Sequence, residues 1–128
     1  SLKKLKKKHI IEKNNENFLI ESIKVKHGKI KSIMYKINNS CAYVSDVSKI
    51  YQKDLKKIKK LKYLVVDCLR YDPHPSHFNL KNVVDLVDII KPKKTILTNM
   101  NNEIDYNEVK KLLPKNIIPA YDGMSFLI

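Results

Sequence analysis

The chain has 128 residues, of which 43% are hydrophobic and 30% charged, and its formal net charge is +13. This is the size of one globular domain, and the apolar content excludes wholesale disorder. No apolar run approaches the ~18 residues of a membrane-spanning helix, so we expect no transmembrane segment. Arg70 is the single arginine among the basic residues, whereas proteins that read base edges depend on the planar guanidinium. We therefore expect most lysines to form a solvated surface.

Residues 1–17 are rich in lysine, asparagine and glutamate. They predict a basic lead-in that is solvated or disordered, outside the folded domain of residues 18–128. Because the chain begins with serine rather than methionine, we expect a fragment of a longer protein. Cys41 and Cys68 each lie in an apolar run, which favours buried free thiols over a disulfide. Free thiols are typical of an intracellular, reducing compartment such as the cytoplasm.

From Phe18 onward, short apolar segments alternate with turn residues. Strands are predicted over residues 18–26, 30–37 and 41–44. His27-Gly28 separates the first two strands, and asparagine and serine form the second turn. Three short strands in succession indicate an antiparallel meander.

The second half of the chain alternates between helix and strand. Amphipathic spacing predicts one helix over residues 49–60 and another from the N-cap Asn79 to Ile90. Asp105 predicts the start of a third helix, which Pro114 ends. The apolar segments between the helices predict strands over residues 63–69, 95–98, 117–120 and 124–128. This order indicates the α/β (α+β) class, with one mixed sheet and helices on one face.

Polar residues gather where the predicted strands end. Four strands end in residues of this kind: His27, Asp46, Asp67 and Asn99. His74 and His77 lie in the proline-rich loop after the third of these strands. Loops at one edge of a sheet hold functional groups rigidly. Histidine and aspartate from several strand ends are the donors that a metal-assisted hydrolase needs.

Structural roles also explain several of these residues. Asp46 can cap the helix that follows it, His27 can be a turn residue, and His77 can lie beside a helix cap. Asp67 is harder to explain in this way, because an unpaired carboxylate inside an apolar run is costly to bury. A partner for Asp67 is therefore expected.

A series of short motifs follows in a fixed order along the chain: Val25-Lys26-His27-Gly28, Ala42-Tyr43-Val44-Ser45-Asp46, Val66-Asp67-Cys68-Leu69-Arg70, His74-Pro75-Ser76-His77 and Ala120-Tyr121-Asp122-Gly123. In this order they resemble the second half of the metallo-β-lactamase-fold hydrolases. The branch they resemble is similar to a bacterial phosphodiesterase that acts on cyclic ribosyl phosphates. The resemblance implies the C-terminal half of an αββα sandwich.

The resemblance implies a divalent metal, zinc or manganese, with His27 and Asp46 as ligands. The main metal motif of the family, His-x-His-x-Asp-His, belongs to the preceding half and does not occur in this sequence. Asn99 also stands where the family has histidine, and asparagine binds transition metals more weakly than imidazole. Since catalytic zinc has three protein ligands, we expect metal binding by this chain to be weak or absent.

The same resemblance implies that His77 contacts phosphate or moves a proton and that Asp67 orients its neighbours as a second catalytic residue. It also implies that His74 and Ser76 belong to a substrate loop. The parent protein is then a metal-dependent hydrolase similar to phosphodiesterases, and the chain alone is expected to be inactive.

Two alternatives stay open at this point. Asn99 is also compatible with a degenerate, non-catalytic subunit. A lysine-rich module that binds nucleic acid or an anionic surface is the other alternative, with its densest patches at residues 1–8 and 53–62. Half of a sandwich also leaves an apolar sheet face uncovered, so we expect either pairing with the missing half or self-association.

Overall fold

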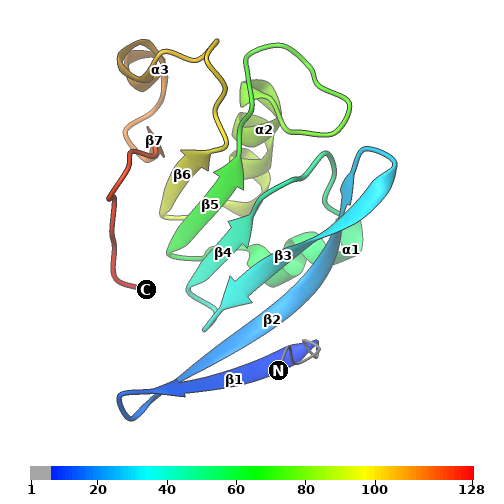
Figure 1. The fold of residues 1–128 in the computed structure, drawn as a ribbon, viewed down its shortest axis with the longest axis vertical. Helices are drawn as coiled ribbons and strands as arrows, with labels where there is room; N and C mark the ends of the chain where they lie inside the picture. Colours follow the sequence, from blue (N-terminus) through cyan, green and yellow to red (C-terminus); the bar gives the residue numbers. More distant parts are fainter. Residues whose placement is uncertain (1–6) are drawn as a thin grey trace.

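The computed structural model describes residues 7–128, and one mixed sheet of seven strands forms its centre (Figure 1). The strands lie side by side in chain order, from β1 to β7. Strands β1 to β4 pair antiparallel, whereas β4 to β7 pair parallel. This confirms the predicted meander and mixed sheet. The strands are β1 Lys8–Lys13, β2 Glu16–His27, β3 Ile30–Ile37, β4 Cys41–Val44, β5 Tyr63–Asp67, β6 Lys94–Thr98 and β7 Ile117–Pro119.

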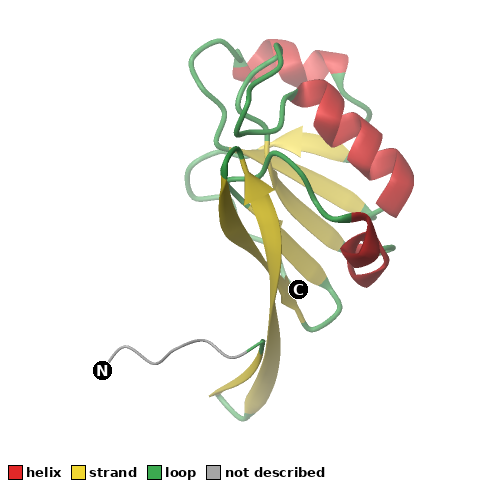
Figure 2. Ribbon diagram, turned by 90° about the vertical axis from the view of Figure 1, so that its right-hand side faces the viewer, coloured by secondary structure: helices red, strands yellow, loops and turns green. Residues whose placement is uncertain are grey.

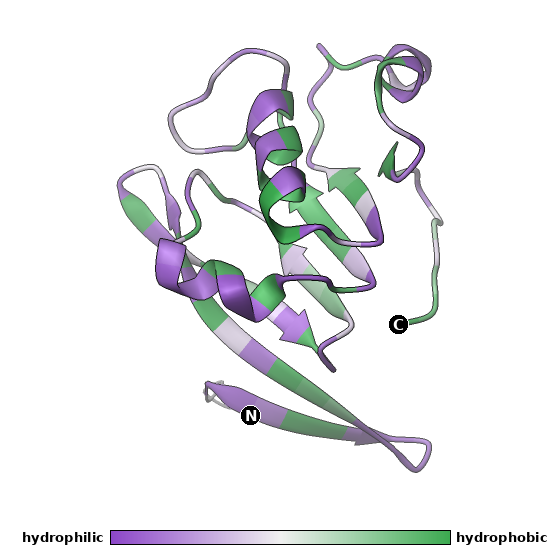
Figure 3. Ribbon diagram, turned by 180° about the vertical axis from the view of Figure 1, so that it is seen from behind, coloured by the Kyte–Doolittle hydropathy of each residue, from purple (hydrophilic) through white to green (hydrophobic). Residues whose placement is uncertain are grey.

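The helices cover one face of this sheet (Figure 2). They are α1 Gln52–Leu55, continued by the 3-10 helix η1 Lys56–Ile58, then α2 Leu80–Ile90 and α3 Tyr106–Leu112. The predicted cap of α2 is confirmed, because the Asn79 side chain accepts from the Asn82 backbone N–H at 2.9 Å. Hydrophobic and hydrophilic residues alternate along α2 (Figure 3), and its buried face packs on one core with β4, β5 and β6. Within residues 7–128, no helix is long and apolar enough to cross a bilayer.

The N-terminal region differs from the expected lead-in. From Lys8 onward the chain forms a hairpin, in which β1 pairs antiparallel with β2. Asn14 and Asn15, with φ of 54° and 62°, form its two-residue turn, a conformation that asparagine tolerates. The side chains of β1 are almost all exposed, so its sequence lacks the alternation of a half-buried strand. Residues 1–6, which hold most of the first lysine patch, lie outside the described residues.

Two other predicted elements are different in the structure. The helix expected over residues 49–60 begins only at Gln52, because the Lys49 carbonyl accepts from the Lys26 N–H at 2.9 Å and the chain there lies beside β2. The strand expected over residues 124–128 is absent from the sheet. This segment instead places the Phe126 ring against Tyr63, with ring centroids 4.4 Å apart.

The sheet face opposite the helices is partly open and carries apolar side chains together with lysines, since Lys24 pairs with Ile33 and Lys94 pairs with Tyr63. Paired residues of neighbouring strands share a face, and the register pairs Tyr35 with Tyr43 and Tyr43 with Val65. Ile33 and Tyr43 are each 41% exposed. We call this surface the open face, and its apolar residues are Ile20, Ile33, Tyr35, Ile37, Tyr43, Tyr63 and Val65.

An ion pair joins Glu21 of β2 to Lys36 of β3, and the two side chains are only 18% and 10% exposed. The hydrogen bond from Lys36 lowers the pKa of Glu21, against the opposing effect of burial. A carboxylate whose pKa is lower in the folded than in the unfolded state stabilises the fold at pH values above the unfolded-state pKa. That stabilisation is lost as the pH falls through the folded pKa.

We therefore expect Glu21→Gln to lower the free energy of unfolding by about 1–3 kcal/mol near neutral pH, because it leaves the Lys36 charge buried without its partner. The difference between wild type and variant shrinks as the pH falls below the ordinary carboxyl range. Urea unfolding at several pH values measures this effect. Lys8, which also contacts Glu21 but is 69% exposed, provides the control, since Lys8→Ala removes only a surface pair. A pH-independent loss in Glu21→Gln would contradict the prediction.

Candidate metal centre

Polar residues lie along one rim of the sheet, at the carboxyl ends of neighbouring strands. Because β4, β5 and β6 run parallel, the residues that end or follow them meet at one edge. Asp46 and Asn99 have φ of 49° and 58°, a left-handed conformation that Asp and Asn adopt more readily than most residues. Asp67 is the last residue of β5. The structure therefore brings these three predicted residues to the same rim.

His27 joins the rim from the end of β2. Its Nδ1 lies 2.7 Å from the Ser76 backbone oxygen, and the Gly28 N–H donates to Ser48 Oγ at 2.9 Å. Gly28 has a φ of +59°, and a Cβ at this position would lie 3.0 Å from the Ser76 Cβ. The β2–β3 turn thus packs tightly against the loop of residues 70–79, which we call the 70–79 loop.

Asp67 fixes His77 within this loop. The two are joined by a hydrogen bond of 2.6 Å between His77 Nδ1 and Asp67 Oδ2. The same oxygen accepts from the Val47 N–H at 3.1 Å. Asp67 is completely buried, and its Oδ1 has no hydrogen-bond partner among the described residues. Burial raises the pKa of Asp67, while the hydrogen bonds with His77 and Val47 oppose this shift. His77 is the partner that the apolar run around Asp67 requires.

His27, Asp46 and His77 form a compact set of metal donors. One ligand atom from each residue lies within 4.8 Å of the others. The two imidazole rings meet edge to face, with centroids 4.7 Å apart. Asp46 does not cap α1, whose N-cap is Tyr51, so the capping alternative is wrong. Two imidazoles and one carboxylate suit zinc and related ions, and the residues present therefore fit a divalent metal.

The 70–79 loop carries the other predicted site residues. The backbone N–H of Ser76 donates to His74 Nδ1 at 3.2 Å, and Ser76 Oγ lies at the same distance from this nitrogen. The His74 ring lies beside His77, with centroids 5.2 Å apart. Partial loss of hydration and the charge of Arg70 lower the pKa of His74. The guanidinium of Arg70 donates to two carbonyls of its own loop, at 3.3 and 2.7 Å, and so holds the loop together.

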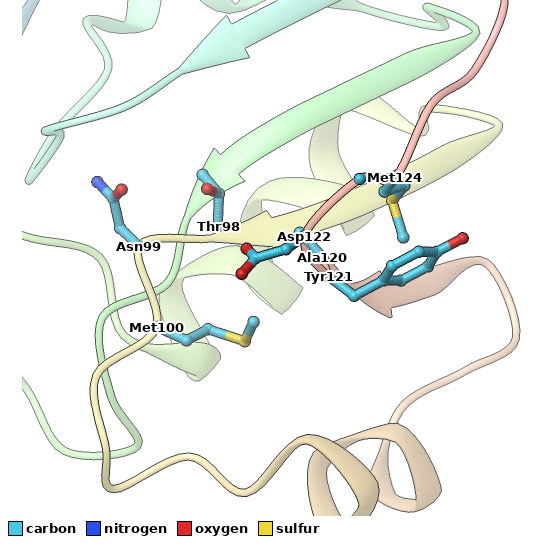
Figure 4. A pocket seen from close by; sticks show the side chains of 8 residues that line it. Thr98, Asn99, Met100, Ala120, Tyr121, Asp122 and Met124 are labelled. Carbon is cyan, nitrogen blue, oxygen red and sulfur yellow. The ribbon is translucent and has the colours of Figure 1, made fainter.

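Asn99 lies at the same rim, beside a pocket. Its Nδ2 donates to Ser45 Oγ at 2.9 Å, a contact that the sequence did not reveal. The pocket has a volume of about 440 Å³ and lies between the end of β6 and residues 120–124. Figure 4 shows the Asp122 carboxylate between the side chains of Thr98 and Met100. The sequence indicated only a turn at Asp122, because no local pattern marks a cavity formed by two distant segments.

Both cysteines are free thiols with buried side chains, as predicted. Burial raises the pKa of Cys41, and burial together with the nearby Asp67 raises the pKa of Cys68 to about 12. Since the thiolate is the reactive form, we expect neither thiol to react with a disulfide reagent in the folded protein near neutral pH. Both should react once the chain is unfolded in denaturant. Fast modification of either cysteine under native conditions would contradict this expectation.

Comparison with known proteins gives clear matches only among solved structures. No protein-family model and no curated protein matches the chain. A diphosphatase of the PhnP family is 29% identical, with a TM-score of 0.84 over 93% of this chain and 46% of that protein. The metallo-β-lactamase fold protein YhfI from Bacillus subtilis is 14% identical, with a TM-score of 0.72 over 94% of this chain and 53% of that protein.

A zinc-bound protein belongs to the same group of structures. Zn²⁺-bound PqqB from Methylobacterium extorquens is 12% identical, with a TM-score of 0.68 over 87% of this chain and 50% of that protein. In all three comparisons the chain spans about half of the other protein. The expected resemblance is confirmed at the level of fold: this chain has the metallo-β-lactamase fold, over about half the length of the proteins it resembles.

Proposed function

We propose that the chain forms one wall of the active site in a metal-dependent hydrolase that cleaves phosphoester bonds. One observation carries the proposal: His27, Asp46, Asp67 and His77 converge on a single rim, and the Nδ1 of each histidine lies at hydrogen-bond distance from an acceptor. Donors held in this way are typical of a catalytic metal site. The similarity to a diphosphatase supports a phosphate-containing substrate.

In this proposal His27 and Asp46 hold a divalent ion, zinc or manganese. When bound, such an ion lowers the pKa of a coordinated water and polarises a phosphoryl oxygen. Asp46 is exposed, so its carboxylate is accessible from solvent. The tight contact between Gly28 and Ser76 fixes the position of His27 relative to the 70–79 loop.

His77 is proposed to contact the phosphate or to move a proton. Its Nδ1 is occupied by Asp67, which leaves Nε2 as the nitrogen available for proton exchange. Asp67 is a positioning residue, since it is buried and acts through His77. His74 and Ser76 belong to the same loop, and we assign them to substrate contact. The pocket next to Asn99 offers space for the organic part of the substrate.

The open face supports a proposal for what this chain contacts. The fold of the similar proteins extends over about twice the length of this chain, and the His-x-His-x-Asp-His motif does not occur within its 128 residues. An apolar surface of this kind is typical of an interface. We therefore assign the open face to contact with a second segment that supplies further metal ligands, or with a second copy of this chain.

Complementation tests the proposed function. The chain is mixed with the part of the PhnP-family diphosphatase that it does not cover, and hydrolysis of bis(p-nitrophenyl) phosphate is followed with Zn²⁺ or Mn²⁺. We expect no hydrolysis by the chain alone and measurable hydrolysis by the mixture. His77→Ala should lower the rate by about 10²–10⁴-fold, the usual contribution of an acid–base group.

The control is His9→Ala, because His9 lies on β1, which is outside the rim. An unchanged rate in His77→Ala would contradict the assigned role of His77. A mixture that becomes active only with Asn99→His would instead support the degenerate, non-catalytic alternative.

A further inference from the structure

Lysines gather along the edge of the sheet opposite the candidate metal centre. Because β5, β6 and β7 run parallel, their amino ends meet at one edge, on the other side from the arrowheads that mark the rim (Figure 1). Residues 59–62 precede β5, residues 91–94 lead into β6, and residue 115 precedes β7. We call this surface the basic edge, and its lysines, all exposed, are Lys59, Lys60, Lys62, Lys91, Lys93, Lys94 and Lys115.

Backbone hydrogen bonds hold the segments of the basic edge side by side. The Lys60 N–H donates to the Ile90 carbonyl at 2.7 Å, and the Lys94 N–H donates to the Lys62 carbonyl at 3.0 Å. β7 pairs with β6 in turn, which brings residue 115 to the same edge. Neighbouring strands of a sheet lie about 4.7–4.9 Å apart. Lysines from three distant parts of the sequence therefore form one row.

The basic edge has no acidic counterpart. Elsewhere in the fold, lysines pair with carboxylates, as Lys36 does with Glu21 and Lys57 with Asp54. No lysine of the basic edge forms an ion pair within residues 7–128. Residues 55–63, 89–98 and 109–119 contain neither aspartate nor glutamate. Cations that are not balanced repel one another, and a bound polyanion removes this repulsion.

Two of these lysines adopt a backbone conformation that favours other residues. The φ angle is 55° at Lys60 and 49° at Lys91, and Lys91 is the C-cap of α2. Glycine or asparagine usually fills such left-handed positions. The negative end of the helix dipole attracts a lysine at the C-cap, but this attraction does not account for Lys93 and Lys94, which lie beyond the helix. The fold alone therefore does not explain the basic edge.

We infer that the basic edge binds the phosphate backbone of a nucleic acid without reading its base sequence. Lysine ammonium groups contact phosphates as point charges, whereas readout of base edges depends largely on arginine. The single arginine, Arg70, donates to carbonyls of its own loop. A row of cations suits a linear polyanion better than a flat anionic membrane. The inference is independent of the proposed function, since the basic edge and the rim lie at opposite ends of the parallel strands.

Fluorescence anisotropy with labelled poly(U) RNA and poly(dT) DNA tests the inference at several salt concentrations. We expect the full chain to bind both strands, with an affinity that falls steeply as salt increases. A triple variant, Lys60→Asn with Lys91→Asn and Lys93→Gln, should bind at least about tenfold more weakly. Its salt slope should be smaller by about 2, because each phosphate contact on a single strand contributes about 0.7. Asparagine tolerates the left-handed conformation, so thermal unfolding followed by circular dichroism should show an intact fold.

A second triple variant is the matched control. It combines Lys13→Gln, Lys24→Gln and Lys31→Gln, which remove the same charge from exposed positions on β1, β2 and β3, and it should keep the salt slope of wild type. Equal weakening in the two variants would overturn the inference, because net charge rather than the basic edge would then determine binding. Failure to bind either strand at low salt would also overturn it, as would binding to phosphatidylserine vesicles but to neither strand. A strong preference between poly(U) and other RNA sequences would contradict recognition of the backbone alone.

Discussion

Asp67→Ala is expected to lower the rate of hydrolysis by the complemented protein about 10–100-fold, the usual effect of removing a residue that orients another group of a metal site. The substitution releases the His77 ring, because Oδ2 of Asp67 lies 2.6 Å from its Nδ1. It also leaves the Val47 N–H, on a fully buried residue, without its acceptor. An unsatisfied buried donor costs about 1–3 kcal/mol, so urea unfolding should show a matching loss of stability.

Asp67→Asn is the matched control for this experiment. In wild type a single oxygen, Oδ2, contacts both His77 and Val47, and the carbonyl oxygen of an asparagine can take its place. We therefore expect Asp67→Asn to keep most of the stability and to lower the rate of hydrolysis less than Asp67→Ala. Equal losses in the two variants would contradict the view that hydrogen bonding at this oxygen holds the loop.

The second large effect is expected at the open face. Without a covering segment, the isolated chain should self-associate at high concentration, as measured by sedimentation equilibrium. Ile33→Lys should weaken this association by at least about tenfold, because it replaces an exposed apolar side chain of this face with a second charge opposite Lys24. The net charge of +13 opposes association of identical chains, so added salt should strengthen it by screening this repulsion.

Ile89→Lys serves as the control, since Ile89 is 51% exposed but lies on α2, on the helix-covered side of the sheet. This variant should associate like wild type. A chain that stays monomeric at every concentration, and that also fails to bind the complementary part of the diphosphatase, would contradict the assignment of the open face.

The sequence predicted those elements whose side chains are buried on one side. β3, β4 and α2 were found with correct or nearly correct bounds, because burial imposes a clear periodicity. β1 was missed, since its side chains are almost all exposed and nothing in its pattern marks an inner face. The helix near residue 50 was predicted too long, because the contact between Lys49 and Lys26 depends on tertiary structure.

The residues of the candidate site could be predicted from the sequence, but the hydrogen bonds between them could not. Polar residues at strand ends indicated His27, Asp46 and Asp67, since neighbouring parallel strands bring their ends together. The hydrogen bond between Asp67 and His77 joins residues 10 positions apart, and the one between Asn99 and Ser45 joins residues 54 positions apart. Local sequence patterns carry no information on such contacts, so these hydrogen bonds could not be predicted.

The order of the strands has a consequence for how the chain acquires its structure. Each strand from β1 to β7 lies next to its neighbour in the sequence, but a crossover that contains a helix separates the two strands of each parallel pair. The antiparallel pairs join residues that are close in the sequence and can form early, whereas the parallel pairs, such as Tyr63 with Lys94, close long crossovers and form more slowly. During synthesis the ribosome releases the strands in the order in which they join the growing sheet, and the nascent chain has native partners available from its first hairpin onward.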